Sequence, residues 1–554
     1  MRGGAAGRSR LRVMTTLYRG GFVYSPADPF ATALVATDSE IAWIGSDEAA
    51  ALHVDGVDEV VELDGALVTP TFVDAHVHLS QTGQGLAGVD LLDVPTLAAA
   101  LERVEAGARR RQGRPLYVHS WDETRWPECR AVTAAELDRA SYGGVVYMPR
   151  IDGHSAVVSS ALAAASGARG LPGWSDTGLV TRESHHAARS AFHDGISPAD
   201  RRSHIDTALA TAASLGVGLV HENAGPHVSS EDDVRDVIAA GERGDGPQVI
   251  AYWGELTASE AGARELLQRL GVHGLAGDLN VDGSLGSRTA ALRAPYADAD
   301  HHGNAYLSPE QVRDHVVACT LAGAQAGFHV IGDAGADRVI EGMRLAADVV
   351  GEDRFRRARH RLEHLEMVDA EGIATLVRLG VVASVQPAFD AEWGGTGGMY
   401  AARLGAGRAL TLNPFGEMAA AGLSMALGSD SPVTPVAPWE AVRACVNHRN
   451  PRQRISARSA FLAHTRGGWR AAGIDDRGYL DLGQPASFAI WSVGDLVVQA
   501  PDDRIQTWST DPRSGTPGLP DLSPGAALPT TLRTVVRGRT VFEREGALDR
   551  SRAR

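Results

Sequence analysis

Two histidines at the end of an apolar segment are the residues of this sequence best suited to chemistry. His76-Val77-His78 follows the mainly apolar run 67–75. Because side chains alternate along a β-strand, the two imidazoles of such a pair share one face and can converge on a metal ion. Two ligands do not complete a site, since zinc in proteins takes about four. A lone pair could equally be a surface or packing pair, so further ligands must come from elsewhere.

Three further candidate ligands follow in order, each near the end of a strand-like segment. His329 lies in 327–333, His364 in 361–366, and Asp430 follows 424–429. Taken singly, each histidine could be a buried core residue. Histidines and one aspartate at successive strand ends are what a parallel βα barrel needs to hold a metal at its C-terminal face, where barrel active sites lie. The series predicts such a centre.

The elements that would position these residues can be counted along the chain. There are eight strand-like segments. Four carry the candidate ligands His76, His329, His364 and Asp430 at or near their ends, and the other four are 216–222, 248–253, 278–282 and 381–386. Ala- and Leu-rich runs with helical spacing lie between them, such as 309–327 and 369–380, and each ends in glycine as a helix C-cap would. Alternating strands and helices predict an α/β fold, a (β/α)8 TIM barrel.

Two regions fall outside the barrel, which we expect at 69–478. Residues 15–68 and 479–548 hold short alternating segments, and we expect the two chain ends to pair into a small β-sandwich. Residues 80–212, after the first barrel strand, are too long for a βα connection, which predicts an inserted subdomain over the barrel mouth. Residues 1–14 are basic without a following apolar region, so we expect a disordered leader, and Met14 could be the true start.

Composition narrows the class of protein. The 554 residues carry a formal net charge of -15, which argues against nucleic acid or an anionic membrane as partner. No apolar stretch approaches the roughly 20 residues needed to span a bilayer. The three cysteines lie far apart and indicate reduced residues of a cytoplasmic protein. We expect a cytoplasmic enzyme with a small-molecule substrate, and leave a homodimer open.

Two motifs carry a resemblance to a known family. Pro70-Thr71-Phe72-Val73-Asp74-Ala75-His76-Val77-His78 and Gly428-Ser429-Asp430-Ser431-Pro432, in this order with His329 and His364, resemble the amidohydrolase superfamily from about residue 15 to about 548. Segments 121–127, 150–162, 282–290 and 385–387 resemble its branch of YtcJ-like proteins, which includes N-substituted formamide deformylases. The resemblance implies a metal-dependent hydrolase that cleaves an amide-type C–N bond, such as an N-formyl or N-acyl bond.

One departure from that family concerns the metal. Many amidohydrolases bridge two metal ions with a carboxylated lysine, yet all 53 basic residues here are arginine. In the relatives that this chain resembles, the lysine precedes the motif 282–290, and Asp278 stands at its place. Either the short carboxylate bridges two ions or the site holds one. We favour one ion of zinc or another divalent metal.

The ligands suggest a mechanism. A divalent metal held by neutral imidazoles lowers the pKa of its water towards neutrality and polarises the substrate carbonyl. Asp430 would take the proton from that water and return it to the leaving nitrogen, unless it is only a ligand or a turn cap. Candidate substrate-binding residues, each of which could instead be packing or solvated, are Trp121, Glu123, His154, Arg288 and Gln386.

Other functions stay open on the sequence. A metal-dependent deaminase would use the same fold, but such relatives usually carry a glutamate shortly after the His329 position, where this chain offers only Asp333. A cyclic amide hydrolase is a further alternative. A non-catalytic binding barrel is the least expected, because the ligand series is complete.

Overall fold

The computed structural model describes residues 14–499, 508–509 and 517–552. The expected leader 1–14 therefore lies outside the described residues, apart from Met14. The chain divides into two compact units. One is formed by both chain ends, up to Thr71 and from Tyr479 onward, and the other by Phe72–Gly478 with Leu522–Leu528.

Eight strands of the larger unit form one parallel sheet, as predicted. In sheet order they are β7 (Phe72–Val77), β13 (Val217–Ala224), β14 (Gln248–Trp253), β15 (Gly274–Leu275), β16 (Gln325–Val330), β17 (Arg361–His364), β18 (Val382–Val385) and β19 (Ser424–Leu427). The ends of the first and last strands are joined through the backbone, because Asp430 N donates to His76 O at 2.7 Å and His78 N donates to Ser431 O at 3.0 Å. The sheet is thus a nearly closed barrel.

Two sequence predictions within the barrel were wrong in their bounds. The fourth strand is β15 and not 278–282, because Gly277 takes a left-handed φ of 89° just beyond β15 and turns the chain out of the strand. The predicted helix 309–327 ends at Ala322, where Gly323 is the C-cap, and the residues after it form β16. The helix predicted over 369–380 is confirmed, since Asp369 and Gly380 cap it.

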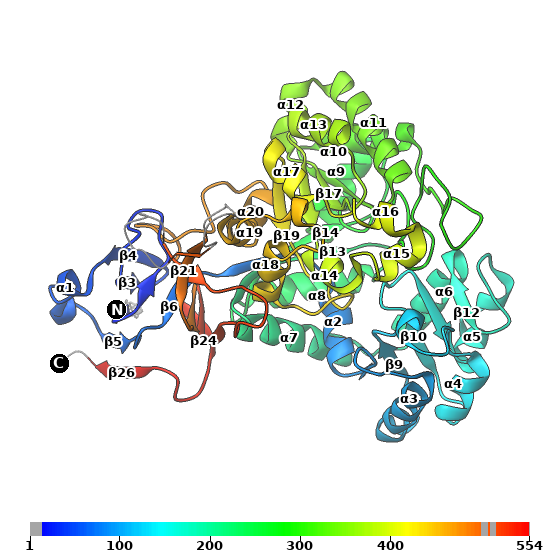
Figure 1. The fold of residues 1–554 in the computed structure, drawn as a ribbon, viewed down its shortest axis with the longest axis horizontal. Coiled ribbons are helices and arrows are strands. Elements are labelled where there is room, and N and C mark those ends of the chain that lie inside the picture. Colours follow the sequence, from blue (N-terminus) through cyan, green and yellow to red (C-terminus); the bar gives the residue numbers. More distant parts are fainter. Residues whose placement is uncertain (1–13, 500–507, 510–516, 553–554) are drawn as a thin grey trace, which may run out of the picture. The chain divides into compact units, whose positions relative to one another are not determined.

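Helices surround the barrel strands (Figure 1). Six of the helices named below begin at a Ser or Asp whose side chain accepts from a backbone N–H of the first turn, which satisfies a donor that the helix cannot. They are α2 (Leu79–Leu86), α7 (Pro198–Ser214), α8 (Glu231–Glu242), α9 (Glu260–Leu270), α10 (Pro309–Ala322), α11 (Asp333–Val350), α12 (Glu352–Ala358), α13 (Ala370–Leu379), α14 (Pro387–Trp393), α15 (Met399–Leu404), α16 (Ala406–Ala409), α17 (Phe415–Ala421), α18 (Pro438–Val446), α19 (Ala457–Ala463) and α20 (Arg466–Ala471). No helix of the described part of the chain has the length and apolar character needed to cross a bilayer.

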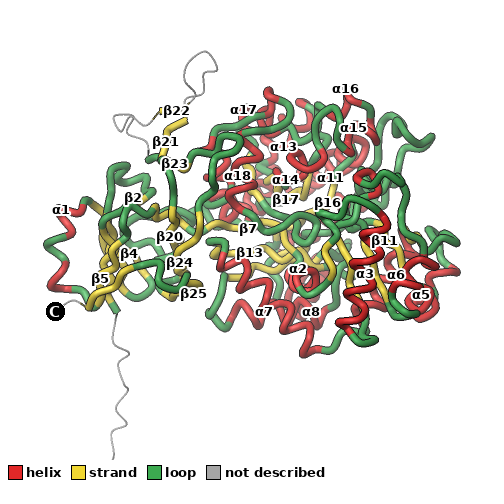
Figure 2. Tube along the Cα trace, turned by 60° about the horizontal axis from the view of Figure 1, so that its bottom comes forward, coloured by secondary structure: helices red, strands yellow, loops and turns green. Residues whose placement is uncertain are grey.

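A second sheet lies between α2 and α7 in the chain. Its strands, in sheet order, are β12 (Leu179–Thr181), β11 (Ser155–Val158), β10 (Val146–Pro149), β9 (Leu116–His119) and β8 (Val89–Asp90). Its helices are α3 (Leu97–Arg111), α4 (Ala134–Ala140), α5 (Ser160–Ser166) and α6 (Arg182–Asp194). Alternate residues of the strands enter two apolar cores, so that Val118 packs with α3 and α4 while Tyr117 packs with α5 and α6. Figure 2 shows these strands between helices.

The smaller unit contains two five-stranded sheets, each built from both chain ends. The first, in order, is β26 (Asp549–Arg552), β5 (Glu59–Glu62), β1 (Thr15–Arg19), β3 (Ala33–Thr37) and β4 (Glu40–Gly45). The second is β2 (Phe22–Val23), β6 (Leu67–Pro70), β20 (Phe488–Ser492), β24 (Thr530–Val536) and β25 (Arg539–Glu543). Both sheets contribute to one apolar core that contains Tyr18, Val68 and Phe488. The unit also holds α1 (Asp47–Ala50), β21 (Leu496–Gln499), β22 (Trp508–Ser509) and β23 (Leu519–Pro520).

Candidate metal centre

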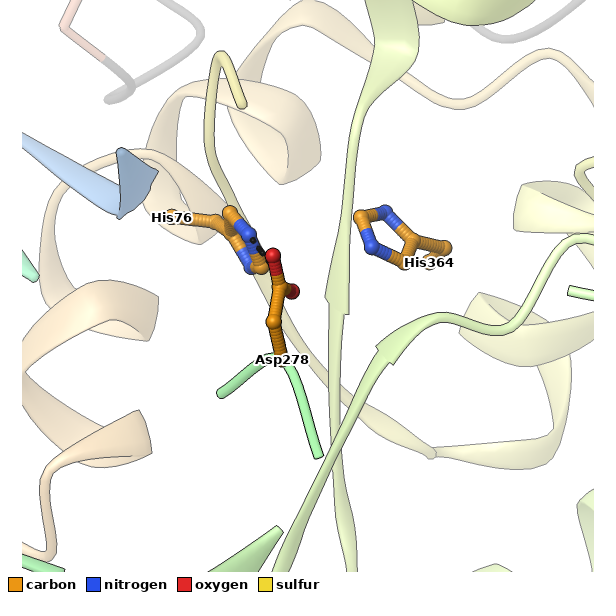
Figure 3. A group of neighbouring side chains, drawn as sticks. All are labelled: His76, Asp278 and His364. Carbon is orange, nitrogen blue, oxygen red and sulfur yellow. Dashed lines mark ion pairs between the residues drawn. The ribbon is translucent and has the colours of Figure 1, made fainter. Parts of the chain in front are cut away.

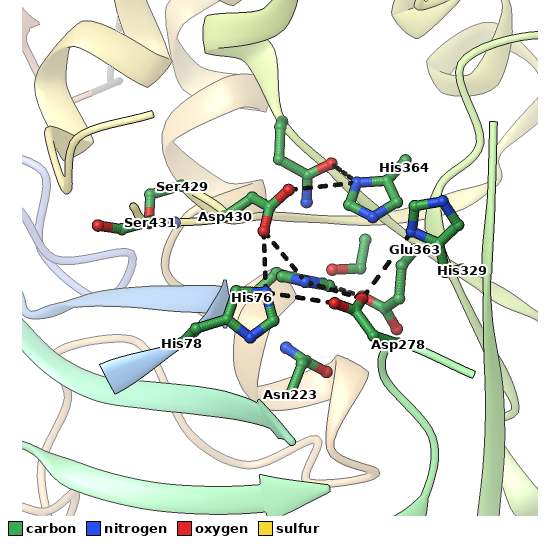
Figure 4. Close-up of polar contacts among 12 residues, drawn as sticks. His76, His78, Asn223, Asp278, His329, Glu363, His364, Ser429, Asp430 and Ser431 are labelled. Carbon is green, nitrogen blue, oxygen red and sulfur yellow. Dashed lines mark hydrogen bonds and ion pairs between the residues drawn. The ribbon is translucent and has the colours of Figure 1, made fainter. Parts of the chain in front are cut away.

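His76 and His78 point into the carboxyl end of the barrel from β7 and from the residue after it. Their ring centroids lie 5.2 Å apart, and both side chains are buried. Asp430 Oδ1 lies 3.4 Å from His76 Nε2 and 3.1 Å from His78 Nε2 (Figure 4). The first and last barrel strands therefore bring three of the predicted ligands together.

Asp278 reaches the same place from the loop after β15. Its Oδ1 lies 3.4 Å from His76 Nε2, and its Oδ2 lies 3.3 Å from His78 Nε2. Oδ1 is also 3.9 Å from His329 Nδ1. Figure 3 shows Asp278 between His76 and His364. The carboxylate is thus placed between the two histidines of β7 and the histidine of β16.

His329 and His364 complete the cluster from β16 and β17. Their ring centroids lie 4.5 Å apart, and the His364 ring lies 5.0 Å from that of His76. His364 and Asp430 have left-handed φ values of 70° and 55°, which cost free energy in residues with a Cβ and gather at functional sites. All six residues predicted as ligands therefore meet at the ends of the barrel strands.

The cluster fits a divalent metal ion. His76 Nε2 and Asp278 Oδ1 are buried and have no hydrogen-bond partner among the described residues, which is costly unless something else binds them. Two groups of ligand atoms lie within 4.8 Å of one another, namely His76, Asp278 and His364, and His76, His78 and Asp430. Imidazole nitrogens and carboxylate oxygens are the donors that zinc and similar ions take.

Electrostatics give the same picture. Burial alone would lower the pKa of His76, but the carboxylates of Asp430, Asp278 and Glu363 raise that pKa well above its ordinary value. Burial would raise the pKa of Asp278, but His78 and His76 hold it well below its ordinary value. The metal-free cluster therefore retains protons that a cation would displace.

Three residues hold the predicted ligands in place, of which the sequence prediction missed Glu363 and Asp74 and gave Gln386 a substrate-binding role instead. Glu363 Oε2 accepts from His76 Nδ1 at 2.9 Å, which leaves Nε2 facing the cluster. Gln386 Oε1 lies 2.7 Å from His364 Nδ1. Asp74 Oδ1 accepts from Ser429 N at 2.9 Å and from His76 N at 3.3 Å, and so ties the loop before Asp430 to β7.

A signal for Glu363 was present in the sequence. Arg361 and Glu363 are two positions apart in β17, so both side chains point to the same face of the strand, and all residues of that strand are buried. Arg361 Nε and Nη2 donate to the two oxygens of Glu363 at 2.5 and 2.9 Å. A charged pair at this spacing in a buried strand indicates a polar network inside the barrel.

The predicted substrate-binding residues have different surroundings. His154 lines a cavity together with His78 and Asp430, and its ring lies 5.0 Å from that of His329. Trp121 is buried against Trp126 in the insertion and donates to Met148 O at 3.0 Å.

The remaining candidates contact protein groups and are not among the residues that line this cavity. Glu123 pairs with Arg150 at 2.9 Å and with Arg403 at 2.7 Å. Arg288 pairs with Asp298 at 2.7 Å, and Gln386 contacts His364 as described.

The sequence is similar to those of known proteins. Residues 59–542 match the amidohydrolase family. The chain is 26% identical to the protein LONG AFTER FAR-RED 3 of Arabidopsis thaliana, over 84% of each protein. It is 23% identical to YtcJ of Bacillus subtilis (strain 168), over 86% of this chain and 94% of that one.

Solved structures agree on the fold. A crystal structure described as an uncharacterized metal-dependent hydrolase from Pyrococcus horikoshii OT3 superimposes with a TM-score of 0.69 at 24% identity, over 86% of this chain and 97% of that one. A crystal structure described in the same words, from Pyrococcus furiosus, superimposes with a TM-score of 0.67 at 24% identity, over 86% of this chain and 98% of that one. With a family match that spans most of its length and a barrel of the same fold, the chain belongs to the amidohydrolase family.

Proposed function

We propose that this protein is a metal-dependent hydrolase that cleaves an amide-type C–N bond, N-formyl or N-acyl, in a small molecule. The observation that carries the proposal is the buried, unpartnered His76 Nε2, which faces the carboxylates of both Asp278 and Asp430. Membership of the amidohydrolase family supports the reaction type. The three cysteines are unpaired, which supports a cytoplasmic location.

One zinc or similar divalent ion is the stoichiometry that we propose. The two candidate ligand groups share His76, and because Glu363 engages its Nδ1, only Nε2 is left to bind an ion, which can be one ion only. The groups are therefore overlapping positions of a single site. When bound, the ion would supply an activated water and a polarised carbonyl.

Side chains of the cluster would carry out the proton transfers and position the substrate. Asp430 directs Oδ1 towards His76 and His78, while its Oδ2 lies 4.0 Å from His364 Nδ1. We assign to Asp430 the proton taken from the attacking water and its return to the leaving nitrogen. Glu363 fixes the tautomer of His76, and His154 would contact the substrate from the insertion.

A deaminase is a weaker alternative. Asp333, the acid that follows His329, accepts from Arg293 N at 2.8 Å and from Ala334 N at 2.9 Å. Its carboxylate is therefore engaged by backbone at the start of α11.

Metal analysis combined with turnover tests the proposal. The purified protein should contain about one divalent ion per chain and hydrolyse at least one member of a panel of N-formyl and N-acyl amines. Asp430→Asn should abolish turnover while Asp278→Asn retains about one ion. If the wild type holds two ions and Asp278→Asn only one, the site is binuclear with Asp278 as the bridge. Well-folded protein without stoichiometric metal would overturn the proposal.

A further inference from the structure

Helix α6 presents a polar face to the cavity that contains the metal centre. Arg182, His185, His186, Arg189 and His193 recur at helical spacing, and all of them line the cavity together with His78, Asp278 and Asp430. Arg189 also lines an adjoining cavity of about 550 Å³. It therefore lies on the route between the outer cavity and the metal centre.

Arg189 differs from the other arginines of this region in its partners. Its Nε donates to the Tyr147 hydroxyl at 3.2 Å, its Nη1 donates to His227 O at 3.0 Å, and its Nη2 donates to Gly153 O. All three acceptors are neutral. No carboxylate of the described residues is recorded within ion-pair distance of it.

Buried arginines elsewhere in the chain are neutralised. Arg150 pairs with Asp122 at 2.8 Å and with Glu123 at 2.9 Å. Arg361 pairs with Glu363 at 2.5 Å, and Arg403 has two carboxylate partners. Because a cation withdrawn from water is costly without an anion, the half-buried Arg189, whose hydrogen-bond partners are all neutral and which lines the cavity, is suited to bind an anion there.

The Asp278 carboxylate acts on Arg189 only from beyond ion-pair distance, and the groups in contact with Arg189 carry no negative charge. Burial raises the pKa of the Tyr147 phenol, so this hydroxyl stays neutral. Burial, and then the charge of Arg189 itself, lower the pKa of His186 and His193 to about 3. The histidines of this wall are therefore neutral, and Arg189 keeps its full charge.

We propose that Arg189 binds a carboxylate of the substrate, which makes the substrates N-formyl or N-acyl amino acids or similarly anionic amides. This inference rests on the proposed amide hydrolysis. A guanidinium has five N–H groups, and the three contacts above leave one free on each terminal nitrogen, which suits a two-pronged bond to a carboxylate.

Arg189 lines the same cavity as His78, Asp278 and Asp430, so a single substrate in that cavity can meet both Arg189 and the metal centre. Gly153, whose carbonyl accepts from Arg189, directly precedes His154, and the His154 ring lies 5.0 Å from the ring of His329. In an N-acyl α-amino acid the carboxylate and the amide nitrogen are joined through one carbon, so both groups are near each other in one small molecule. One molecule could therefore contact Arg189 while its carbonyl lies at the metal centre.

Binding of a non-hydrolysable pair tests the inference independently of turnover. Levulinate has the skeleton of N-acetylglycine with the amide N–H replaced by a methylene group, and its methyl ester lacks the charge. Calorimetry on the zinc-loaded wild type should show that levulinate binds at least about 10-fold more tightly than the ester. Arg189→Gln should weaken levulinate binding by about 10- to 100-fold and leave the ester within about 3-fold.

Two further variants keep the test decisive. Arg182→Gln removes an exposed charge from the same helix face and should preserve the preference for levulinate. Arg189→Lys retains the charge without the fork and should reduce the preference, even if Arg189→Gln does not fold.

The outcomes separate the two proposals. Absence of a preference in the wild type, or equal weakening of both ligands by Arg189→Gln, overturns the carboxylate subsite. A clear preference in zinc-loaded protein that hydrolyses no N-formyl or N-acyl compound would instead overturn the proposed function alone.

Discussion

At the scale of single residues, His76 is the side chain on which the centre depends. Its Nδ1 donates to Glu363, and its Nε2 faces both Asp278 and Asp430. Glu363 in turn receives two bonds from Arg361. The tautomer and orientation of this proposed ligand are thus set by a buried ion pair inside the barrel, an arrangement usual for metal-binding histidines.

Glu363→Gln should weaken metal binding. The amide would direct N–H groups at His76 or Arg361, which are both donors, so the imidazole would lose its fixed orientation. We expect zinc affinity to fall by about 10- to 100-fold, measured by competition with a chromophoric chelator. Ser384→Ala is the matched control, because it removes the 3.1 Å contact of Arg361 with Ser384 and spares the His76–Glu363 bond. Equal losses in both variants would contradict the assignment.

The sequence indicates Glu363 only as half of a buried pair with Arg361, and it does not indicate Arg189 at all. His76, His78, His329, His364 and Asp430 could be predicted because each residue type stands at a strand end. The role of Glu363 is to accept a hydrogen bond from His76, which lies 287 positions away in the sequence. The significance of Arg189 lies in the carboxylate that it lacks, which only the folded chain reveals.

At the scale of elements, the start of helix α2 is held by a carboxylate from the neighbouring strand. His78 is the N-cap of α2 but its side chain makes no capping bond. Glu222 of β13 instead accepts from Leu79 N at 2.7 Å. One of the free N–H groups of the first turn is thereby satisfied, immediately beside a proposed ligand.

Glu222 should make the stability of the metal-free protein depend on pH. Burial raises the pKa of Glu222 from 4.5 to about 7, so folding takes up a proton between these values. The free energy of unfolding should therefore fall as pH rises through this window, by on the order of 3 kcal/mol. Glu222→Gln keeps an acceptor for Leu79 N and should remove this dependence of stability on pH. In denaturation experiments the variant should be more stable than the wild type at pH 8 and equally stable at pH 4. Parallel profiles would refute this.

Trp121 is a substrate-binding candidate by sequence, but it lies in the core of the insertion. Trp121→Ala should destabilise the insertion by about 3–5 kcal/mol, because it removes a fully buried aromatic side chain. Hydrogen exchange of β9 and β10 should accelerate while metal content stays constant. Trp121→Phe keeps most of the packing, so its stability and exchange rate should lie between those of the wild type and of Trp121→Ala. A raised KM without faster exchange would support direct substrate contact instead.

The loop after β15 shows why element bounds were harder to predict than element order. The strand contributes only two residues, and the chain then turns at Gly277, so the apolar residues of 278–282 belong to a loop. The order of strands and helices survived this error because the short strand and the predicted one occupy the same place in the chain, between β14 and α10. A short strand such as β15 pairs with a neighbour on each side, so it can form without a long run of alternating or apolar residues in its own sequence.

At the scale of the whole molecule, the absence of lysine removes one route to a metal bridge. A carboxylated lysine forms from carbon dioxide, so apo-enzymes that depend on it regain activity faster with metal when bicarbonate is supplied. All 53 basic residues here are arginine, and Asp278 occupies the place between His76, His78 and His329. The side chain between these histidines is therefore a carboxylate that needs no chemical assembly.

Reconstitution of the chelator-treated protein with zinc should proceed at the same rate with and without bicarbonate. Asp278 needs no chemical assembly, and the chain has no side-chain amine that could take up carbon dioxide. Zinc uptake followed by chelator fluorescence, with sodium chloride at equal ionic strength and pH as the control, measures the rate directly. Asp278→Asn should slow or weaken uptake under both conditions alike, since the variant loses a charged oxygen near His76 and His78. Acceleration by bicarbonate in the wild type would mean that a ligand outside this cluster is formed during assembly.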